Sequence, residues 1–267
     1  MFSSKKLILL GAGFCAAFVC ANLLLSALHN SGFSFHYISS WPINVFGPAD
    51  ATRHYRLLVS LALLAAFFIA QRFGAARDYR LPAVMVIGFA LLVGSNLIQG
   101  FEPGFVDPIT EDEFNDGYTP QYYHDAVEIT DPVAFFQNYN AIQPTLHMHA
   151  RTHPPGPLLL FYALIKCLRS PALMSLAIAA VAVALSAYFL YHLLLTELPA
   201  KVAGFTTFLF LLLPSVQIYY LVTIDALVAG LLLGVFYCFK RGTAASLVAC
   251  AALLSAAFML TFVSVWI

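Results

Sequence analysis

The sequence predicts an all-α fold, a polytopic bundle of transmembrane helices with about eight spans and one large extracytoplasmic loop that carries interfacial helices. Hydrophobic residues make up 61% of the chain and charged residues only 10%, whereas a soluble domain carries about 25% charged residues. Apolar runs close to the roughly 20 residues that cross a bilayer recur along the sequence. Between them lies one long hydrophilic segment, residues 102–153. The chain therefore divides into a membrane part and a polar part.

Charge and cysteine content exclude two classes of function. The 13 basic and 13 acidic residues balance, and a nucleic-acid-binding surface needs a basic excess, so no nucleic-acid partner is expected. The cysteines lie in or beside apolar runs without C-x-x-C spacing: Cys15, Cys20, Cys167, Cys238 and Cys250. They are therefore interpreted as packing residues rather than as a disulfide or metal framework.

The N-terminal region, residues 1–101, is expected to hold three spans: Leu7–Leu28, Leu57–Phe73 and Pro82–Phe101. The first follows Lys5 and Lys6, and its apolar core is too long for a cleaved signal peptide, so we interpret it as an uncleaved span. The positive-inside rule places these lysines and the basic turn 74–80 in the cytoplasm. The N-terminus is then cytoplasmic, and the polar segments 29–56 and 102–153 lie outside a plasma or inner membrane.

The C-terminal region, residues 154–267, is expected to hold further membrane helices: Pro154–Leu168, Pro171–Leu195, two short spans within Val202–Phe239, and Ala244–Ile267. The first is predicted to return inward, and the third run to break between Pro214 and Asp225. Strict alternation then places the Lys240-Arg241 pair outside, against the positive-inside rule, so the sequence leaves the topology of 202–241 open. Because the chain stops inside its last apolar run, we expect it to be truncated at the C-terminus.

Residues 102–153 are the candidate catalytic loop. They hold nine of the 13 acidic residues and four of the eight histidines, but only one base, Arg151. Carboxylates and imidazoles are costly to bury in hydrocarbon, so these groups mark an extracytoplasmic segment. Within it, the stretch His124–Tyr139 is predicted to form an amphipathic helix along the membrane interface.

An acidic cluster near the start of this loop offers a general base. Asp112 is the first candidate and Glu113 the second, with Glu111 and Asp116 as rivals. A carboxylate held near the membrane surface can take a proton from an acceptor hydroxyl. The alternative is a solvated acidic loop without a catalytic role.

The end of the loop offers a guanidinium and several imidazoles. Arg151 can bind a phosphate through two hydrogen bonds, and His153 precedes Pro154-Pro155-Gly156, where a helix N-terminus favours anions. Alternatively, the prolines simply start a helix. His147 and His149, with His153, are weak candidates for metal ligands; the alternative is polar anchoring at the interface. No cofactor is certain, and a divalent metal stays open.

Two further residues are candidates for substrate binding. Asp225 is an ionisable residue in an apolar stretch, which favours a functional role; alternatively it is an interfacial residue at a helix break. Tyr123 belongs to a tyrosine-rich part of the loop that can stack on a sugar or pack against lipid and neighbouring helices.

Short motifs follow one another in a defined order: Asp112-Glu113, Tyr122-Tyr123-His124-Asp125-Ala126, Phe135-Phe136-Gln137-Asn138-Tyr139, His153-Pro154-Pro155-Gly156, and then Leu213-Pro214-Ser215, Tyr219-Tyr220 and Asp225-Ala226-Leu227. This order resembles the C-type superfamily of polytopic membrane glycosyltransferases, in the branch of protein O-mannosyltransferases and lipid A aminoarabinose transferases. The resemblance covers roughly residues 103–241. The chain departs from the pattern in having two additional spans before the one that leads into the loop.

The resemblance implies inverting transfer of a hexose or pentose from a polyprenyl-phosphate donor to a hydroxyl of a glycan, lipid or protein at the outer membrane face. It implies Asp112 or Glu113 as the base, and Arg151 and His153 as the groups that meet the departing phosphate. A different hypothesis is a transporter or flippase for a lipid-linked or anionic solute, with Asp225 and the helix broken at Pro214 forming a midplane site. A third is a membrane scaffold without catalysis.

Overall fold

The computed structural model describes residues 78–97, 100–110, 122–221 and 223–262, together with the single positions 62, 65, 69 and 72. All of them belong to one unit of the chain, His54–Ile267. These residues form helices and turns without a strand, so the all-α prediction is confirmed for this part of the chain. The predicted span Leu7–Leu28 lies outside the described residues, as does Leu57–Phe73 apart from the four single positions.

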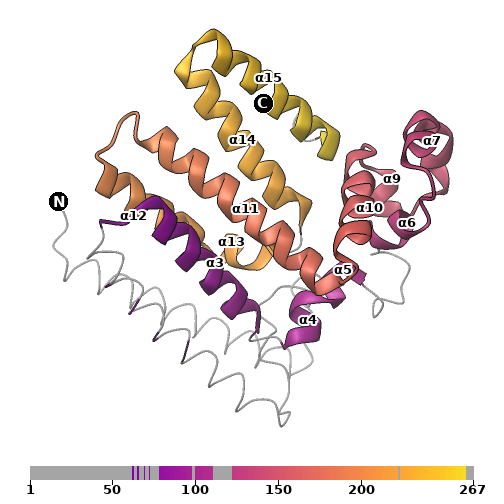
Figure 1. The fold of residues 1–267 in the computed structure, drawn as a ribbon, viewed down its shortest axis with the longest axis horizontal. Helices are drawn as coiled ribbons and strands as arrows, with labels where there is room; N and C mark the ends of the chain where they lie inside the picture. Colours follow the sequence, from indigo (N-terminus) through magenta and orange to yellow (C-terminus); the bar gives the residue numbers. More distant parts are fainter. Residues whose placement is uncertain are drawn as a thin grey trace, which may run out of the picture. The chain divides into compact units, whose positions relative to one another are not determined.

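Apolar helices packed side by side form the core of this unit (Figure 1). They are α3 (Leu81–Leu97), α11 (Pro171–Leu194), α12 (Ala200–Leu211), α14 (Ile224–Arg241) and α15 (Ala244–Leu260). The central helix, α11, packs against α3, α12 and α14, and α14 packs in turn against α15. We call this set of helices the bundle.

Short helices fill most of the described segment between α3 and α11. They are α4 (Phe101–Phe105), α5 (Asp107–Thr110), α6 (Tyr123–Val127), α7 (Pro132–Gln137), α8 (Tyr139–Ile142), the 3-10 turn Gln143–Thr145, α9 (Met148–Arg151) and α10 (Gly156–Leu168). The prediction of one continuous helix over His124–Tyr139 is therefore wrong. A carboxylate oxygen of Asp131 accepts hydrogen bonds from the N–H groups of Val133 and Ala134, at 2.8 and 3.1 Å, and this cap starts a new helix at Pro132.

Small residues bring α11 and α14 close together. On α11, Ala182 and Ser186 are fully buried. On α14, Gly230 and Gly234 form a G-x-x-x-G pair, a spacing that lets two helix backbones approach closely. A Cβ atom added to Gly230 would lie 2.8 Å from the Cβ of Leu185, and one added to Gly234 would lie 2.8 Å from the Phe189 ring. The contact therefore leaves no room for larger side chains at these glycines.

The predicted helix break after Pro214 is confirmed. The chain forms α12, then the short helix α13 (Pro214–Tyr219), and then α14, which begins at Ile224. Proline has no N–H group, so a break leaves backbone carbonyls that need other donors. The side-chain amide of Gln217 donates to the carbonyl of Leu211 at 2.5 Å.

Polar residues at the end of α3 hold this break in place. The Ser95 hydroxyl donates to the side-chain oxygen of Gln217, and the Asn96 amide donates to the Gln217 backbone carbonyl, both at 2.9 Å. Asn96 is only 4% exposed, so its hydrogen bonds lie inside the packed protein. The break therefore sits beside the C-terminal end of α3.

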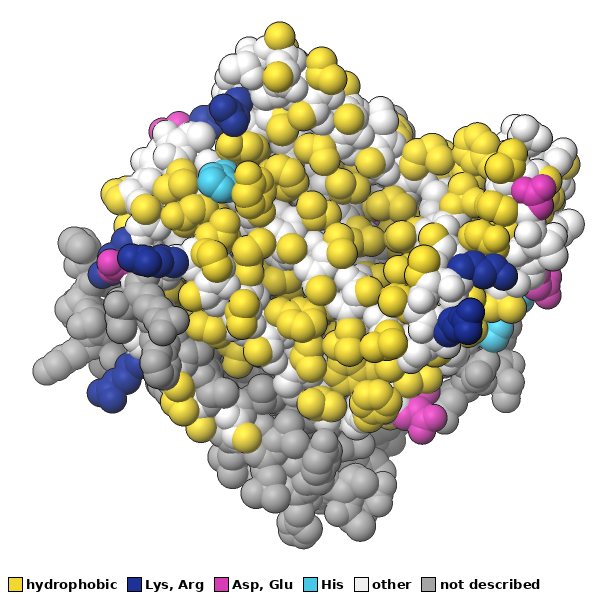
Figure 2. Space-filling view, in the orientation of Figure 1, with side chains coloured by type: hydrophobic (Ala, Val, Ile, Leu, Met, Phe, Trp, Pro, Cys, Tyr) yellow, Lys and Arg dark blue, Asp and Glu magenta, His cyan; other side chains and the backbone are white. Residues whose placement is uncertain are grey.

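Ion pairs mark the opposite end of the bundle. Lys201 near the start of α12 contacts Asp78, which precedes α3, at 2.8 Å. Lys240 near the end of α14 contacts Glu197, in the turn after α11, at 2.5 Å. The starts of α3 and α12 and the ends of α11 and α14 therefore share one end, which we call the basic end. Figure 2 shows Lys and Arg side chains gathered at this edge of the hydrophobic face.

The other end, which we call the loop end, holds both ends of α10. At its start, Gly156 packs so closely on the C-terminal end of α15 that a Cβ atom would overlap the carbonyl oxygen of Met259. Just beyond its end, α11 begins, and the Ser175 hydroxyl in the first turns of α11 donates to the Phe105 carbonyl of α4 at 2.6 Å. Both ends of α10 therefore lie at the loop end of the bundle, and the inward return of 154–168 stays a prediction.

Helix length separates α11 from the other apolar helices of the described part. With 24 residues, α11 is the one helix there that is both long and apolar enough to cross a membrane, while α3, α10, α12 and α15 are apolar but have 12–17 residues each. The span count of about eight stays a prediction.

Candidate functional site

The loop residues pack onto the bundle through Tyr122, at the start of α6. Its side chain is only 3% exposed, and its ring lies against those of His149, His153 and Phe161, with centroids 5.4, 5.7 and 5.5 Å away. Helix α6 also contacts α5 and runs along α10. The early and late parts of the hydrophilic segment therefore meet at α6.

Two stacked imidazoles precede α10. The rings of His149 and His153 have centroids 4.7 Å apart and lie nearly parallel. Nδ1 of His153 lies 2.9 Å from the carbonyl oxygen of His149; because a carbonyl only accepts, this nitrogen carries the proton, and Nε2 is the acceptor of the neutral ring. Burial against its neighbours lowers the pKa of His149, the nearby His153 lowers it further, and the Asp225 carboxylate opposes both. His149 is therefore neutral at pH 7.

A buried tyrosine holds the segment that leads into α10. The Tyr139 hydroxyl lies 2.5 Å from the His153 carbonyl and 3.3 Å from that of Ala150, and it is the donor. Burial raises the pKa of Tyr139, and the charge of Asp125 adds to this effect. Burial likewise raises the pKa of Tyr122, with a further contribution from the charge of Asp225. Both phenols therefore stay protonated near neutral pH.

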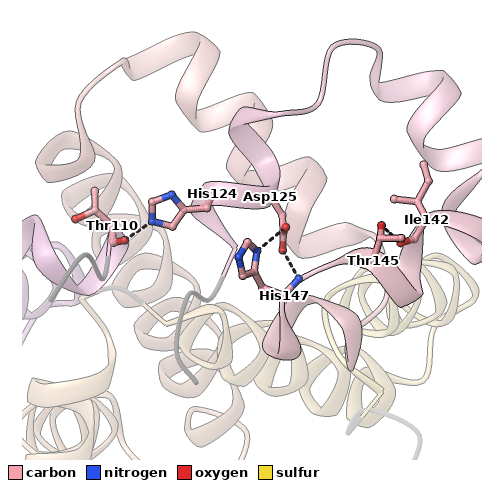
Figure 3. Close-up of polar contacts among 6 residues, drawn as sticks. All are labelled: Thr110, His124, Asp125, Ile142, Thr145 and His147. Carbon is pink, nitrogen blue, oxygen red and sulfur yellow. Dashed lines mark hydrogen bonds and ion pairs between the residues drawn. The ribbon is translucent and has the colours of Figure 1, made fainter. Parts of the chain in front are cut away.

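Two histidine contacts close the loop on itself (Figure 3). Nδ1 of His147 donates to one carboxylate oxygen of Asp125 at 2.8 Å, and the His147 backbone N–H donates to the other at 3.1 Å. Nε2 of His124 lies 2.7 Å from the Thr110 carbonyl, so α6 is tied to the end of α5. These contacts link α5, α6 and the residue before α9.

The histidines predicted as possible metal ligands do not all face one another in this arrangement. His147 pairs with Asp125, whereas His149 stacks on His153. Among the residues that the structure describes, no three His, Cys, Asp or Glu side chains are grouped so as to hold a metal ion.

The four predicted substrate-binding residues lie around the same end of the bundle. Arg151 ends α9 with an exposed side chain, and its carbonyl accepts from the Gln143 amide at 2.8 Å. Asp225 lies in the first turn of α14, where a carboxylate suits the helix dipole, and its charge acts on Tyr122 and His149. Tyr123 is half-buried, with its ring against that of His124.

The predicted bases, Asp112 and Glu113, lie outside the described residues. The described chain stops at Thr110 and resumes at Tyr122. These two attachment points are close in the fold, because His124 bonds to Thr110 while Tyr122 packs on the His149–His153 stack.

A cavity of about 350 Å³ opens elsewhere in the loop, among α6, α7 and α8. Its polar lining includes Asp125, Glu128, Asp131 and Asn138. Asp125 is bonded to His147, and Asp131 caps α7. Arg151, His153, Tyr123 and Asp225 do not line it, so it is separate from the residues that the sequence indicated.

Sequence reasoning missed Tyr122 and Tyr139 as organising residues. It selected Tyr123 from the same tyrosine pair, but the neighbouring ring is the one that reaches the imidazoles. Adjacent residues on a helix point in different directions. Tyr122 lies one turn before Ala126, which is buried, so Tyr122 and not Tyr123 faces inward. Tyr139 was noted only as part of a motif.

No protein-family model, curated protein or solved structure matches this chain.

Proposed function

We propose that this chain is a multi-pass membrane glycosyltransferase that moves a sugar from a polyprenyl-phosphate donor to an acceptor hydroxyl at the outer membrane face. The observation that carries the proposal is the convergence at the loop end. His153, near the end of the hydrophilic segment, lies against Tyr122, which follows the acidic segment 111–121 in the chain, and Arg151 precedes His153 by two residues. A transferase of this kind needs a base and a phosphate-binding cation at one place.

The surface of the bundle supports a membrane location. Large apolar side chains on its helices are exposed, such as Val86, Phe239 and Val248, which are 68%, 69% and 71% exposed. Figure 2 shows a broad hydrophobic face over the bundle, with charged side chains gathered mainly at its two edges. Soluble monomers rarely expose contiguous apolar patches of more than a few hundred Å², whereas a bilayer covers such a face.

The proposed reaction is a single inverting displacement. The acceptor oxygen attacks the anomeric carbon, the bond from that carbon to the phosphate oxygen breaks, and the polyprenyl phosphate leaves with the bonding electrons. The proton of the acceptor hydroxyl passes to a carboxylate, for which Asp112 is the first candidate and Glu113 the second. Asp112 follows Thr110 by two residues, so the covalent chain limits the separation of their Cα atoms to about 7 Å.

The groups at the start of α10 suit the departing phosphate. The guanidinium of Arg151 is exposed and forms no ion pair within the described part of the chain, so it is available for two hydrogen bonds to a phosphate. His153 lies two residues further along, with its ring oriented by the contact of Nδ1 with the His149 carbonyl. Charge that develops on the leaving group is stabilised most by donors fixed in advance.

The position of Asp225 counts against the transporter hypothesis. A midplane carboxylate would lie between the ends of the bundle helices. Asp225 instead lies in the first turn of α14, within electrostatic range of the loop residues Tyr122 and His149. It is therefore better suited to contact a bound donor at the loop end.

The test is sugar transfer from labelled polyprenyl-phosphate donors by membranes that contain the full-length protein. We expect Asp112→Asn to lower the rate at least 100-fold, since general-base catalysis contributes about 10²–10⁴-fold. Undiminished transfer by that variant would remove Asp112 as the base, and loss only with Glu113→Gln would move the role to Glu113.

A matched pair of variants tests the phosphate role. Arg151→Ala should raise the donor concentration required for half-maximal rate about tenfold or more, because one charged hydrogen-bond partner is lost. Lys240→Ala is the control, because Lys240 lies at the basic end and is bonded to Glu197. Equal effects of the two variants would reject the role of Arg151.

A further inference from the structure

We infer that α10 does not cross the membrane but lies at the outer lipid interface, with its C-terminal cations among anionic lipid headgroups. The inference rests on the membrane location proposed above, but not on the glycosyltransferase activity. It also assigns Lys240 and Arg241 to the cytoplasmic side, which the sequence left open.

The first argument is the length of α10. Its 13 residues extend about 20 Å at 1.5 Å per residue, whereas the hydrocarbon core of a bilayer is about 30 Å thick. The neighbouring α11, with 24 residues, extends about 36 Å by the same measure. Only the second of these consecutive apolar helices can cross the bilayer without distorting it.

The second argument is that both ends of α10 are fixed at the loop end. Its first residue, Gly156, packs directly on the Met259 carbonyl at the end of α15. Its last residue, Leu168, precedes a tight turn in which Arg169 adopts a left-handed conformation with φ of 57°. The chain then enters α11, whose Ser175 is bonded to the Phe105 carbonyl of α4. The turn therefore reverses the chain without leaving this end.

The third argument is the surface that α10 presents. Leu158 and Phe161 are buried against the protein, while Ala163 and Cys167 are exposed. Lys166, next to Cys167, is exposed and lies over the Tyr162 ring at 5.3 Å. The ammonium of Lys166 can therefore lie among headgroups while its aliphatic stem and the Tyr162 ring stay on apolar surface.

The cations of α10 fit anionic headgroups. Neither Lys166 nor the exposed Arg169 belongs to an ion pair within the described residues. Lys and Arg side chains at an interface can reach lipid phosphates while their aliphatic stems stay on apolar surface. Lipid phosphate supplies the counter-charge that the described protein does not.

This arrangement places Lys240 and Arg241 in the cytoplasm and, in exchange, places Lys166 and Arg169 at the outer interface. If 154–168 crossed the membrane, α11 would start in the cytoplasm, and Lys240 and Arg241 would lie outside. With α10 held at the outer face, α11 starts outside, the chain returns outward through α12 and α13 together (residues 200–219), and α14 ends in the cytoplasm. The ion pairs Asp78–Lys201 and Glu197–Lys240 then lie on one cytoplasmic face, in accord with the positive-inside rule.

The native Cys167 allows a direct test of sidedness. The full-length protein is expressed with its other cysteines replaced by serine or alanine, and intact cells are treated with a membrane-impermeant maleimide. Two single-cysteine controls on a Cys167→Ala background report the two sides: Thr145→Cys in the loop and Thr196→Cys in the turn at the basic end, both at exposed positions.

We expect Cys167 and Thr145→Cys to react in intact cells, and Thr196→Cys only after the membrane is permeabilised. Reaction of Cys167 only together with Thr196→Cys would show that α10 crosses, and would overturn the inference while leaving the membrane location intact. Equal reaction of all three in intact cells would instead contradict the membrane location itself.

A depth measurement covers the case in which lipid shields Cys167 from the reagent. A fluorophore attached to Cys167 in purified, reconstituted protein is quenched by lipids that carry a nitroxide either on the headgroup or deep in the acyl chain. We expect the headgroup nitroxide to quench at least twice as strongly. Stronger quenching by the deep nitroxide would place this end of α10 in the bilayer core and overturn the interfacial assignment.

Discussion

Helices α10 and α11 follow one another with only two residues between them, and both are apolar, yet they are held in different ways. Helix α11 is the centre of the bundle, with α3, α12 and α14 packed around it and buried small residues such as Ala179 and Ala182 on its surface. Helix α10 is fixed at its start by a glycine contact and by the polar loop that precedes it. The two helices have similar apolar compositions. They differ in length and in the residues that contact their ends.

The largest expected effect comes from filling the contact at the start of α10. Gly156→Val would force side-chain atoms into the Met259 carbonyl, and because backbone has no rotamer by which to move away, the cost should reach about 3 kcal/mol, the upper range for overpacking. Thermal unfolding in detergent, followed by tyrosine and tryptophan fluorescence, measures it. Ala163→Val, at an exposed position on the same helix, should leave the melting temperature nearly unchanged.

The same pair of variants sharpens the comparison of the two helices. Gly156→Val should increase hydrogen exchange of the amides in α10 while those in the middle of α11 stay protected, because α11 takes its stability from the bundle. If both helices lose protection together, they form a single cooperative unit and the contrast drawn between them fails.

Features coded by local residue chemistry were predictable. The helix break follows from Pro214, and Gly and Pro positions mark most helix starts, because these residues restrict the backbone wherever they occur. The separation of charge into a basic end and an acidic loop also follows from the sequence, since ionised groups avoid hydrocarbon. These inferences need no knowledge of what packs against what.

Features that depend on contacts between distant segments were not predictable. The path of α10 is set by Gly156 against Met259 and by Ser175 against Phe105, and neither partner can be identified from local pattern. The division of 124–139 into α6 and α7 could have been found, because Asp131-Pro132 is a helix-start signal. Of the predicted site, the structure brings Arg151, His153 and Asp225 to one end of the bundle, while the roles of Asp112 and Glu113 stay predictions.

A smaller effect is expected from the polar clip before α10. Tyr139→Phe removes the hydroxyl that donates to the His153 and Ala150 carbonyls. The Ala150 carbonyl keeps the backbone N–H of His153 as a donor, so the loss at the His153 carbonyl should account for most of a cost of about 1–2 kcal/mol. Because the ring is kept, packing against Phe135 should persist. Limited trypsin digestion at Arg151 measures the opening of this segment, and Phe135→Leu gives the comparison for lost packing alone.

For Tyr139→Phe, we expect cleavage at Arg151 to become several-fold faster, with no change at Lys201 at the basic end. Equal acceleration at both sites would mean that the hydroxyl stabilises the whole bundle rather than the approach to α10. In that case the distinction between a polar attachment for α10 and an apolar one for α11 would have to be abandoned.

The smallest expected effect is a pH dependence confined to the α10 side. Packing lowers the pKa of His149, so protonation favours the opened state of this segment, in which the ring regains its ordinary pKa of about 6.5. The stabilisation is complete above that value and is lost as the pH falls through it toward the lowered pKa. Hydrogen exchange of residues 122–168, corrected for its intrinsic pH dependence, should therefore lose protection between pH 7.5 and 5.5, while the middle of α11 does not.

Two variants determine whether His149 is the group responsible. His149→Gln should remove most of this pH dependence, whereas His192→Gln, in the last turn of α11, should preserve it. The Asp225 carboxylate favours the protonated form of His149, so Asp225→Asn should deepen the loss of protection at pH 5.5. An unchanged loss in Asp225→Asn would show that the start of α14 and the His149–His153 stack do not interact. It would remove the electrostatic link between α14 and the loop on which the grouping of Asp225 with Arg151 and His153 depends.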